Sequence, residues 1–108
     1  MGSAGWYAIP ERMDRLVFEW DPAKAASNLQ KHGVSFEEAL TVFMNPLGRI
    51  HDDPDHSEAE LREIIVGHSA RNRLLVICFT ERRGAVRIIN ARTASNQERH
   101  DYEENAVS

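Results

Sequence analysis

A chain of 108 residues with 42% hydrophobic and 28% charged residues is expected to form one soluble globular domain, because it can bury one core but not two. Its net charge of -4 argues against a general nucleic-acid coat protein and leaves a local basic site open. A single cysteine excludes a disulfide framework, no apolar run approaches the roughly 20 residues of a membrane span, and the lack of a signal peptide predicts a cytoplasmic protein.

The pattern of apolar and turn residues predicts one domain over 13–108. Residues 1–12 lack periodicity, and we interpret them as a flexible arm or an upstream extension. The expected elements are a strand at 16–20, a helix at 22–32, a helix from Ser35 to about Asn45, a strand at 49–51, a strand at 62–68, two strands at 74–79 and 86–89, and a helix from Ser95 to about Asn105. This order predicts an α+β fold whose late strands pair as an antiparallel meander.

Helix starts and stops are marked by capping residues. Asp21-Pro22 supplies an N-cap and a first-turn proline, and Gly33 ends the helix that follows. The segments 35–38 and 95–98 both have the capping-box pattern of serine followed three residues later by glutamate.

Arginine is concentrated in the last third of the chain. Residues 71–99 hold only two acids, Glu81 and Glu98, although the whole chain is acidic. The arginines of this segment are Arg71, Arg73, Arg82, Arg83, Arg87, Arg92 and Arg99. A sheet this rich in guanidinium groups predicts a phosphate-binding surface. Cys78 lies inside one of its apolar strands, which predicts a buried and unreactive thiol.

An acidic loop follows the second helix and its short strand. It offers five possible metal ligands within six positions, namely His51, Asp52, Asp53, Asp55 and His56. Structural metal sites usually draw fixed ligands from separate elements, whereas Pro54 and the alternating acids are typical of a solvated turn. We therefore expect no metal site there.

Three groups of residues could carry chemistry, and each also has a structural interpretation. Lys31 and His32 either complement the dipole at a helix end or bind phosphate and exchange a proton near neutral pH. Glu60 and Arg62, which share a face of a regular strand, form either a surface ion pair or an acid–base and phosphate-binding pair.

The third group is a pair of arginines on one predicted strand. Arg87 and Arg92 fall on opposite faces of a regular strand, so both can line one cleft only if the strand bends or ends near Ala91. We see no glycine-rich phosphate loop and no Ser-His-Asp or Cys-His set. The excess of arginine and histidine then suggests metal-independent RNA cleavage, which needs a base, an acid and fixed cations around phosphorus.

Several ordered motifs lie between residues 16 and 102. They are Phe18-Glu19-Trp20-Asp21-Pro22 with Lys24 and Asn28, Lys31-His32-Gly33-Val34 with Ser35-Phe36 and Ala39, Asp53-Pro54-Asp55-His56-Ser57 with Glu60, Arg62 and Gly67, Thr80-Glu81-Arg82, and Arg87-Ile88-Ile89-Asn90-Ala91-Arg92 with Ala94, Glu98, Arg99 and Tyr102. In these motifs and their spacing the chain resembles the BrnT family of bacterial toxins. Asn90 departs from the serine that is more usual in the family, which puts any role of that hydroxyl in doubt.

The resemblance implies a ribonuclease toxin of a type II toxin–antitoxin system, without a cofactor. It implies a fold similar to the RelE-like ribonucleases, with two N-terminal helices packed on an antiparallel sheet and a C-terminal helix. It also implies a BrnA-like antitoxin with a ribbon-helix-helix DNA-binding domain, which neutralises the toxin and carries the complex to operator DNA.

The same resemblance suggests which residues act on RNA. We expect His32 or Glu60 to exchange protons, and Lys31 and Arg62 to orient the phosphate. Arg87 or Arg92 would stabilise the transition state. His56 and Arg82 form a second tier of RNA-binding residues, and Tyr102 is expected to pack the last helix on the sheet.

Two other classes of protein are compatible with the sequence. The arginine-rich sheet could belong to a non-catalytic module that binds RNA or an acidic antitoxin segment without cleaving anything. A structural subunit of a larger assembly would instead need an exposed apolar patch. Growth arrest on induction, reversed by the product of the neighbouring gene, distinguishes the toxin from both.

Overall fold

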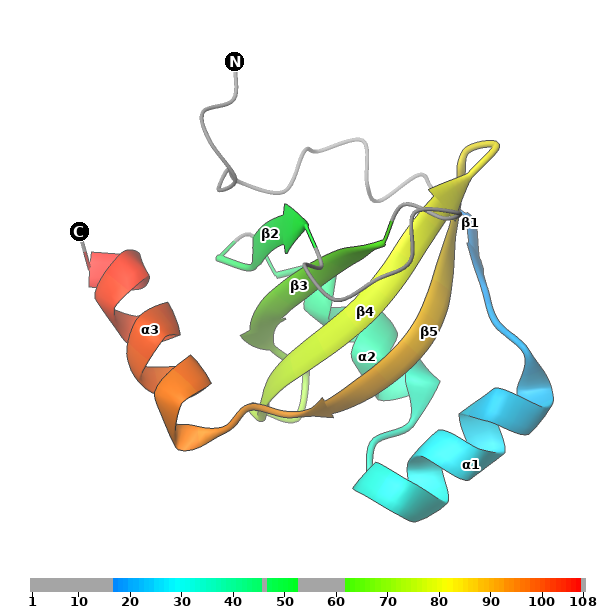
Figure 1. Cartoon of the computed structure of the whole chain (residues 1–108), viewed down its shortest axis with the longest axis horizontal. Helices are drawn as coiled ribbons and strands as arrows, with labels where there is room; N and C mark the ends of the chain where they lie inside the picture. The colour runs from blue at the N-terminus through cyan, green and yellow to red at the C-terminus, as the bar shows by residue number, and fades with distance from the viewer. Residues whose placement is uncertain (1–16, 46, 53–61, 108) are drawn as a thin grey trace.

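The computed structural model describes residues 17–45, 47–52 and 62–107. Within these residues the chain forms an α+β domain of three helices and a five-stranded sheet (Figure 1). The elements are β1 (Val17–Glu19), α1 (Pro22–His32), α2 (Phe36–Val42), β2 (Arg49–Asp52), β3 (Glu63–His68), β4 (Leu74–Arg82), β5 (Ala85–Thr93) and α3 (Asn96–Val107). The predicted order of elements is confirmed. The predicted arm at 1–12 and the acidic loop after Asp52 lie outside the described residues.

The sheet has the strand order β1-β5-β4-β3-β2. Strands β2 to β5 form the predicted antiparallel meander, but β1 pairs with β5 in parallel, with Phe18 opposite Val86. This parallel edge was not predicted. Helices α1 and α2 carry the chain from β1 at one edge of the sheet to β2 at the other, so that β1 lies beside the last strand and not beside β2.

The tip of the β4–β5 hairpin has the expected turn chemistry. Arg83 and Gly84 both have positive φ, 53° and 83°, between the paired residues Arg82 and Ala85. Two consecutive left-handed residues are typical of the type I′ turn, which matches the twist of the strands it joins. The turn lets β4 and β5 extend beyond the predicted segments.

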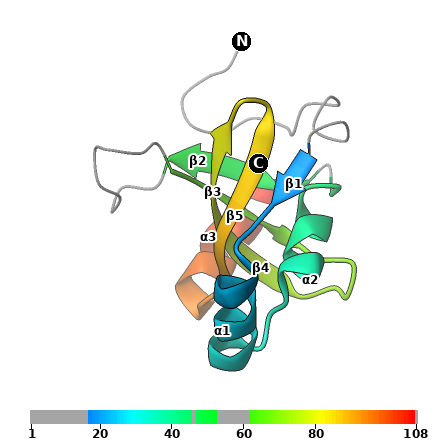
Figure 2. The same ribbon diagram turned by 90° about the vertical axis from the view of Figure 1, so that its right-hand side faces the viewer.

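The main core lies between the sheet and α2 with the residues that flank it, and Ala25 of α1 packs against its margin (Figure 2). Its largest side chains include Phe36 and Phe43 from the helical segment and Phe79 from β4, all at most 1% exposed. Phe43 contacts both Phe18 and Phe79 edge-on, with ring centroids 5.1 and 5.0 Å apart. Each such aromatic pair stabilises a core by about 0.5–1.5 kcal/mol in addition to the free energy of burying its apolar surface.

Helix α3 covers part of the opposite face of the sheet (Figure 2). Tyr102 is buried with Val66, Leu74 and Val76, and its hydroxyl donates to the carbonyl oxygen of Leu47 at 3.1 Å. The packing role predicted for Tyr102 is confirmed. The helix extends two residues beyond the predicted end. In the described part of the chain, no helix is long and apolar enough to cross a membrane.

A β-bulge interrupts the pairing of β4 with β5. Cys78 is opposite Asn90 and Phe79 is opposite Ile88, so Ile89 has no counterpart on β4. Before the bulge the even-numbered residues Val86 and Ile88 face the main core, and after it the odd-numbered Ala91 does. The extra residue thus reverses which side chains of β5 face the core. The predicted burial of Cys78, on the opposite face of β4, is confirmed.

One predicted phosphate-binding arginine instead has a structural partner. The Arg73 guanidinium binds the Glu38 carboxylate through Nε and Nη2, with 2.9 Å between Nε and Oε2, and also donates to the carbonyl oxygen of Gly33. Ser69 donates its hydroxyl to the same carboxylate at 2.7 Å. The hydrogen bonds from Arg73 are the main reason that the pKa of Glu38 lies below its usual value. Glu38 therefore does not complete the predicted capping box, of which only the bond to the Ser35 hydroxyl forms.

Candidate functional site: a basic pocket between α1 and β5

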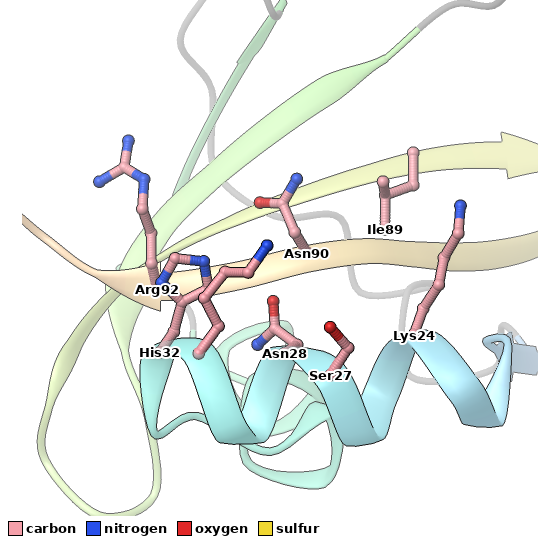
Figure 3. A pocket seen from close by; sticks show the side chains of 8 residues that line it. Lys24, Ser27, Asn28, His32, Ile89, Asn90 and Arg92 are labelled. Atoms are coloured by element: carbon pink, nitrogen blue, oxygen red, sulfur yellow. The ribbon is translucent and has the colours of Figure 1, made fainter.

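A cavity of about 430 Å³ lies between α1 and the second half of β5 (Figure 3). Four of its described lining residues are basic, three are neutral and polar, and one is apolar. The lining residues are Lys24, Ser27, Asn28, Lys31, His32, Ile89, Asn90 and Arg92. None of these described lining residues is acidic. The pocket is therefore suited to an anion.

The pocket exists because β1 covers only the first part of β5. β1 pairs with residues 85–87, and α1 lies along the rest of that edge. The side chain of Asn28 joins the two elements: its Nδ2 donates to the carbonyl oxygen of Ala91 at 2.8 Å and its Oδ1 accepts from the Ala91 N–H at 3.1 Å. A third bond, from Nδ2 to the carbonyl oxygen of Val34, fixes the end of the helix. Asn28 thus forms a rigid floor.

Capping residues set the length and direction of α1. Asp21 accepts a hydrogen bond from the Ala23 N–H at 2.8 Å, and Gly33 ends the helix with φ of 70°. Lys31 and His32 therefore occupy the last turn, as predicted, where a positive charge is favoured by the helix dipole. Figure 3 shows Lys24 at one end of the row of α1 side chains and His32 at the other.

Arg92 lies at the rim of the pocket and is held by a carboxylate of α3. Its Nη1 and Nη2 donate to the two carboxylate oxygens of Glu98 at 2.7 and 2.8 Å. The same carboxylate accepts from the Ser95 N–H at 2.8 Å, which completes the predicted capping box. These bonds, first of all that from Arg92, lower the pKa of Glu98 to about 2. A guanidinium has more N–H donors than these bonds use, so Arg92 can still bind an anion.

The bulge at Ile89 settles the question of how Arg87 and Arg92 are oriented. Both project from the face opposite the main core, because Val86 and Ala91 on either side of the bulge are buried in that core. They are nevertheless five residues apart, roughly 16 Å along a strand. Arg87 lies instead beside Glu19 of β1, with Nη1 and Oε2 3.3 Å apart. The two arginines do not share one pocket.

Two other arginines that were predicted as site residues, Arg62 and Arg82, do not line this pocket. Arg82 lines a second hollow of about 370 Å³ at the hairpin, together with Glu19, Arg83 and Ala85. Arg62 immediately precedes β3, whose first residue, Glu63, is paired with Phe79. Of the predicted site residues, the structure thus brings together Lys31, His32 and Arg92. It places Arg62, Arg82 and Arg87 elsewhere, while His56 and Glu60 lie outside the described residues.

Sequence reasoning did not single out Lys24, Ser27 and Asn90 as pocket residues. The helical period could have found the first two, because positions 24, 27 and 31 lie on one face of a helix. Asn90 could not be found in this way, since the bulge determines where it lies. Among the residues that the structure describes, no group of three or more His, Cys, Asp or Glu side chains could hold a metal ion.

Comparison with known proteins agrees with this fold. A family model described as the ribonuclease toxin BrnT of a type II toxin–antitoxin system matches residues 20–98. The crystal structure of the Brucella abortus ribonuclease toxin BrnT is similar, with a TM-score of 0.52 and 22% identity, over 75% of this chain and 99% of that one. No curated protein matches the chain.

The family match covers well over half of the chain and therefore defines its class, the ribonuclease toxins of type II toxin–antitoxin systems. The chain belongs to the BrnT family. The resemblance noted in the sequence is thereby confirmed, and so is the α+β fold expected from it. The roles of individual residues are not tested by these matches and stay predictions.

Proposed function

We propose that this BrnT-family toxin is a metal-independent endoribonuclease that acts in the cytoplasm like the RelE-like ribonucleases, cleaves RNA and arrests growth. The observation that carries the proposal is the pocket between α1 and β5. It gathers Lys24, Lys31, His32 and Arg92 around one cavity with no acidic lining residue among those described. Fixed cations can stabilise charge on phosphorus, and histidine can transfer a proton.

The proposed reaction is an internal transfer of the phosphoryl group. The ribose 2′-oxygen attacks the adjacent phosphorus, and the bond from phosphorus to the 5′-oxygen breaks. One group removes the 2′-hydroxyl proton and another supplies a proton to the 5′-oxygen, which leaves a 2′,3′-cyclic phosphate and a 5′-hydroxyl. Water, metal and cofactor are not needed for atoms and charges to balance.

We assign roles to the pocket residues according to where they lie. His32 is the candidate proton-transfer residue of the pocket, and Glu60 stays the second candidate from the sequence. Lys31, next to His32, would hold the scissile phosphate. Arg92 is preferred to Arg87 for transition-state stabilisation, because Arg92 lines the same cavity as His32. Arg62, Arg82 and Arg87 would contact RNA outside the pocket, and His56 stays a candidate RNA-binding residue from the sequence.

We propose a BrnA-like antitoxin with a ribbon-helix-helix domain as the partner. A type II system supplies a protein antitoxin, and the basic surface of the toxin suits an acidic segment of that partner. Binding over the pocket would block RNA, and operator DNA would be reached only through the antitoxin.

The test is an RNA-cleavage assay on purified toxin in excess chelator, with product ends identified. Wild-type protein should cleave, and His32→Ala and Arg92→Ala should each lower the rate by about 100-fold or more. Arg71→Gln is the matched control, because Arg71 is 75% exposed, lies in the β3–β4 turn and does not line the pocket.

Each outcome discriminates between functions. Loss of cleavage in chelator, restored by a divalent metal, would overturn metal independence. Growth arrest in cells without cleavage of free RNA would indicate a substrate bound to the ribosome. A folded protein that neither cleaves nor arrests growth but binds RNA or antitoxin would be the non-catalytic module.

A further inference from the structure

We propose that the pocket between α1 and β5 also binds the phosphate adjacent to the scissile one, and that Lys24 is the residue that holds it. This inference rests on the proposed function and deepens it. The inference implies that the substrate is a single strand in which at least one nucleotide has a charged phosphate linkage on each side. Lys24 then acts in binding and takes no part in proton transfer.

The first argument is the separation of the basic side chains. Lys24 and His32 are eight residues apart on α1, or roughly 12 Å along a helix axis. Charge-assisted hydrogen bonds to a phosphate are about 2.7–2.9 Å long, so one phosphate does not span both ends of the row. Figure 3 shows the two side chains at opposite ends of the pocket.

The second argument is the size and lining of the space between these ends. A volume of about 430 Å³ falls in the range of about 300–1,000 Å³ that is usual for pockets holding small organic ligands. Ser27 and Asn90 offer a hydroxyl and an amide there, and Ile89 offers an apolar surface. Such a lining suits a nucleoside better than a bare anion. Asn28 is not available, since its amide is bonded to backbone.

The third argument is charge. Within the described part of the chain Lys24 has no ion-pair partner, in contrast to Arg87 and Arg92, which lie beside Glu19 and Glu98. Lys24 is exposed and lies at the end of a cavity that has no acidic residue in its described lining. A lysine in this position behaves as a point charge for phosphate.

The experiment measures binding of a tetranucleotide with 2′-O-methyl riboses, which cannot be cleaved by attack of the 2′-oxygen. In a set of otherwise identical strands, one phosphate linkage at a time is replaced by an uncharged methylphosphonate. Affinities for wild-type toxin, Lys24→Gln and Arg71→Gln are measured by fluorescence anisotropy over a range of salt concentrations. Circular dichroism checks that each variant is folded.

Lys24→Gln should weaken binding of the fully charged strand by about three- to tenfold and reduce the slope of log affinity against log salt by about one. For the strand in which one particular linkage is neutral, wild type and Lys24→Gln should bind equally well, because Lys24 then has no phosphate charge to contact. In the matching unmodified RNA, that linkage should be next to the cleaved one. Arg71→Gln should show no dependence on linkage.

If Lys24→Gln weakened the binding of every strand equally, or of none, the inference would be overturned. Lys24 would then contribute only to the overall electrostatic attraction of RNA, or nothing. Identity of the sensitive linkage with the cleaved one would also overturn it. Linkage-specific binding by a toxin that never cleaves RNA would support the subsite and reject the proposed catalysis. The two ideas can therefore fail separately.

Discussion

Two pairs of arginine and glutamate in this molecule have the same chemistry and different surroundings. In both, one guanidinium binds both carboxylate oxygens of a glutamate near the start of a helix. The Glu38 side chain is 5% exposed and joins α2 to the β3–β4 turn, whereas Glu98 is 34% exposed and holds Arg92 at the rim of the pocket.

The difference shows what burial does to an ion pair. A buried carboxylate that loses its partner is left without solvation, so the cost falls on folding. When a solvent-exposed carboxylate loses its partner, water solvates it and the fold loses little stability. The main effect is then on the position of the arginine. We therefore expect the Glu38 pair to support the fold and the Glu98 pair to support activity.

The largest expected effect is from Glu38→Gln. It breaks the charged pair in a buried position and should lower the free energy of unfolding by about 3 kcal/mol. Urea denaturation at pH 7 measures this loss, and Glu37→Gln, at an exposed position on the same turn, is the control. The folded fraction should keep its RNA-cleaving activity. A stable but inactive variant would contradict the division between the two pairs.

Asn28→Ala should combine both effects, because the side chain is buried and also forms the floor of the pocket. The N–H and carbonyl groups of Ala91 lose their partners, which should cost about 2–3 kcal/mol of stability. Activity per folded molecule should also fall, since α1 is no longer held to β5. Exchange of the Ala91 amide hydrogen, followed by NMR, would locate the change. If the Ala91 amide hydrogen exchanged as slowly in Asn28→Ala as in the wild type, the Asn28 side chain would not be what holds α1 to β5.

Arg92→Lys tests whether the fork geometry of the guanidinium matters. The charge stays, but the two parallel bonds to Glu98 are lost, so cleavage should slow by about tenfold while stability changes by less than about 1 kcal/mol. Single-turnover kinetics and urea denaturation give the two quantities. A rate equal to that of the wild type would show that a point charge is enough.

The smallest effect is expected from Glu98→Gln and depends on pH. The pKa of Glu98 is about 2 in the folded protein, below its ordinary value of 4.5. The charged carboxylate therefore stabilises the fold fully above pH 4.5, and this contribution is lost as the pH falls toward 2. With allowance for solvent screening, wild type should exceed the variant by about 1 kcal/mol at pH 7. The gap measured by denaturation should close near pH 2. A gap constant with pH would exclude the ion pair as its source.

Local features of this fold could be predicted from the sequence, because their causes lie within a few residues. The caps at Asp21 and Ser95 and the Gly84 turn place three elements correctly. Lys31 and His32 were placed correctly at the end of α1 for the same reason.

Features that depend on contacts between distant residues could not be predicted. The arginine-rich segment predicts Arg73 on a phosphate-binding surface, and the prediction fails because its partner Glu38 is 35 positions away in the chain. The Asn28 bonds span 63 positions, and the bulge at Ile89 follows from the register of two whole strands. These contacts decide which predicted residues share the pocket, so the membership of the candidate site was only partly predictable.

The position of α1 along β5 has a consequence for self-association. A strand that is paired on one side only is a template on which another chain can add a strand, which is a route to aggregation. Beyond Arg87 the outer edge of β5 is covered by α1, and Asn28 occupies the backbone groups of Ala91. A foreign strand could add there only by displacing the helix. The same contact that builds the basic pocket thus protects this part of β5 from pairing with a strand of another copy.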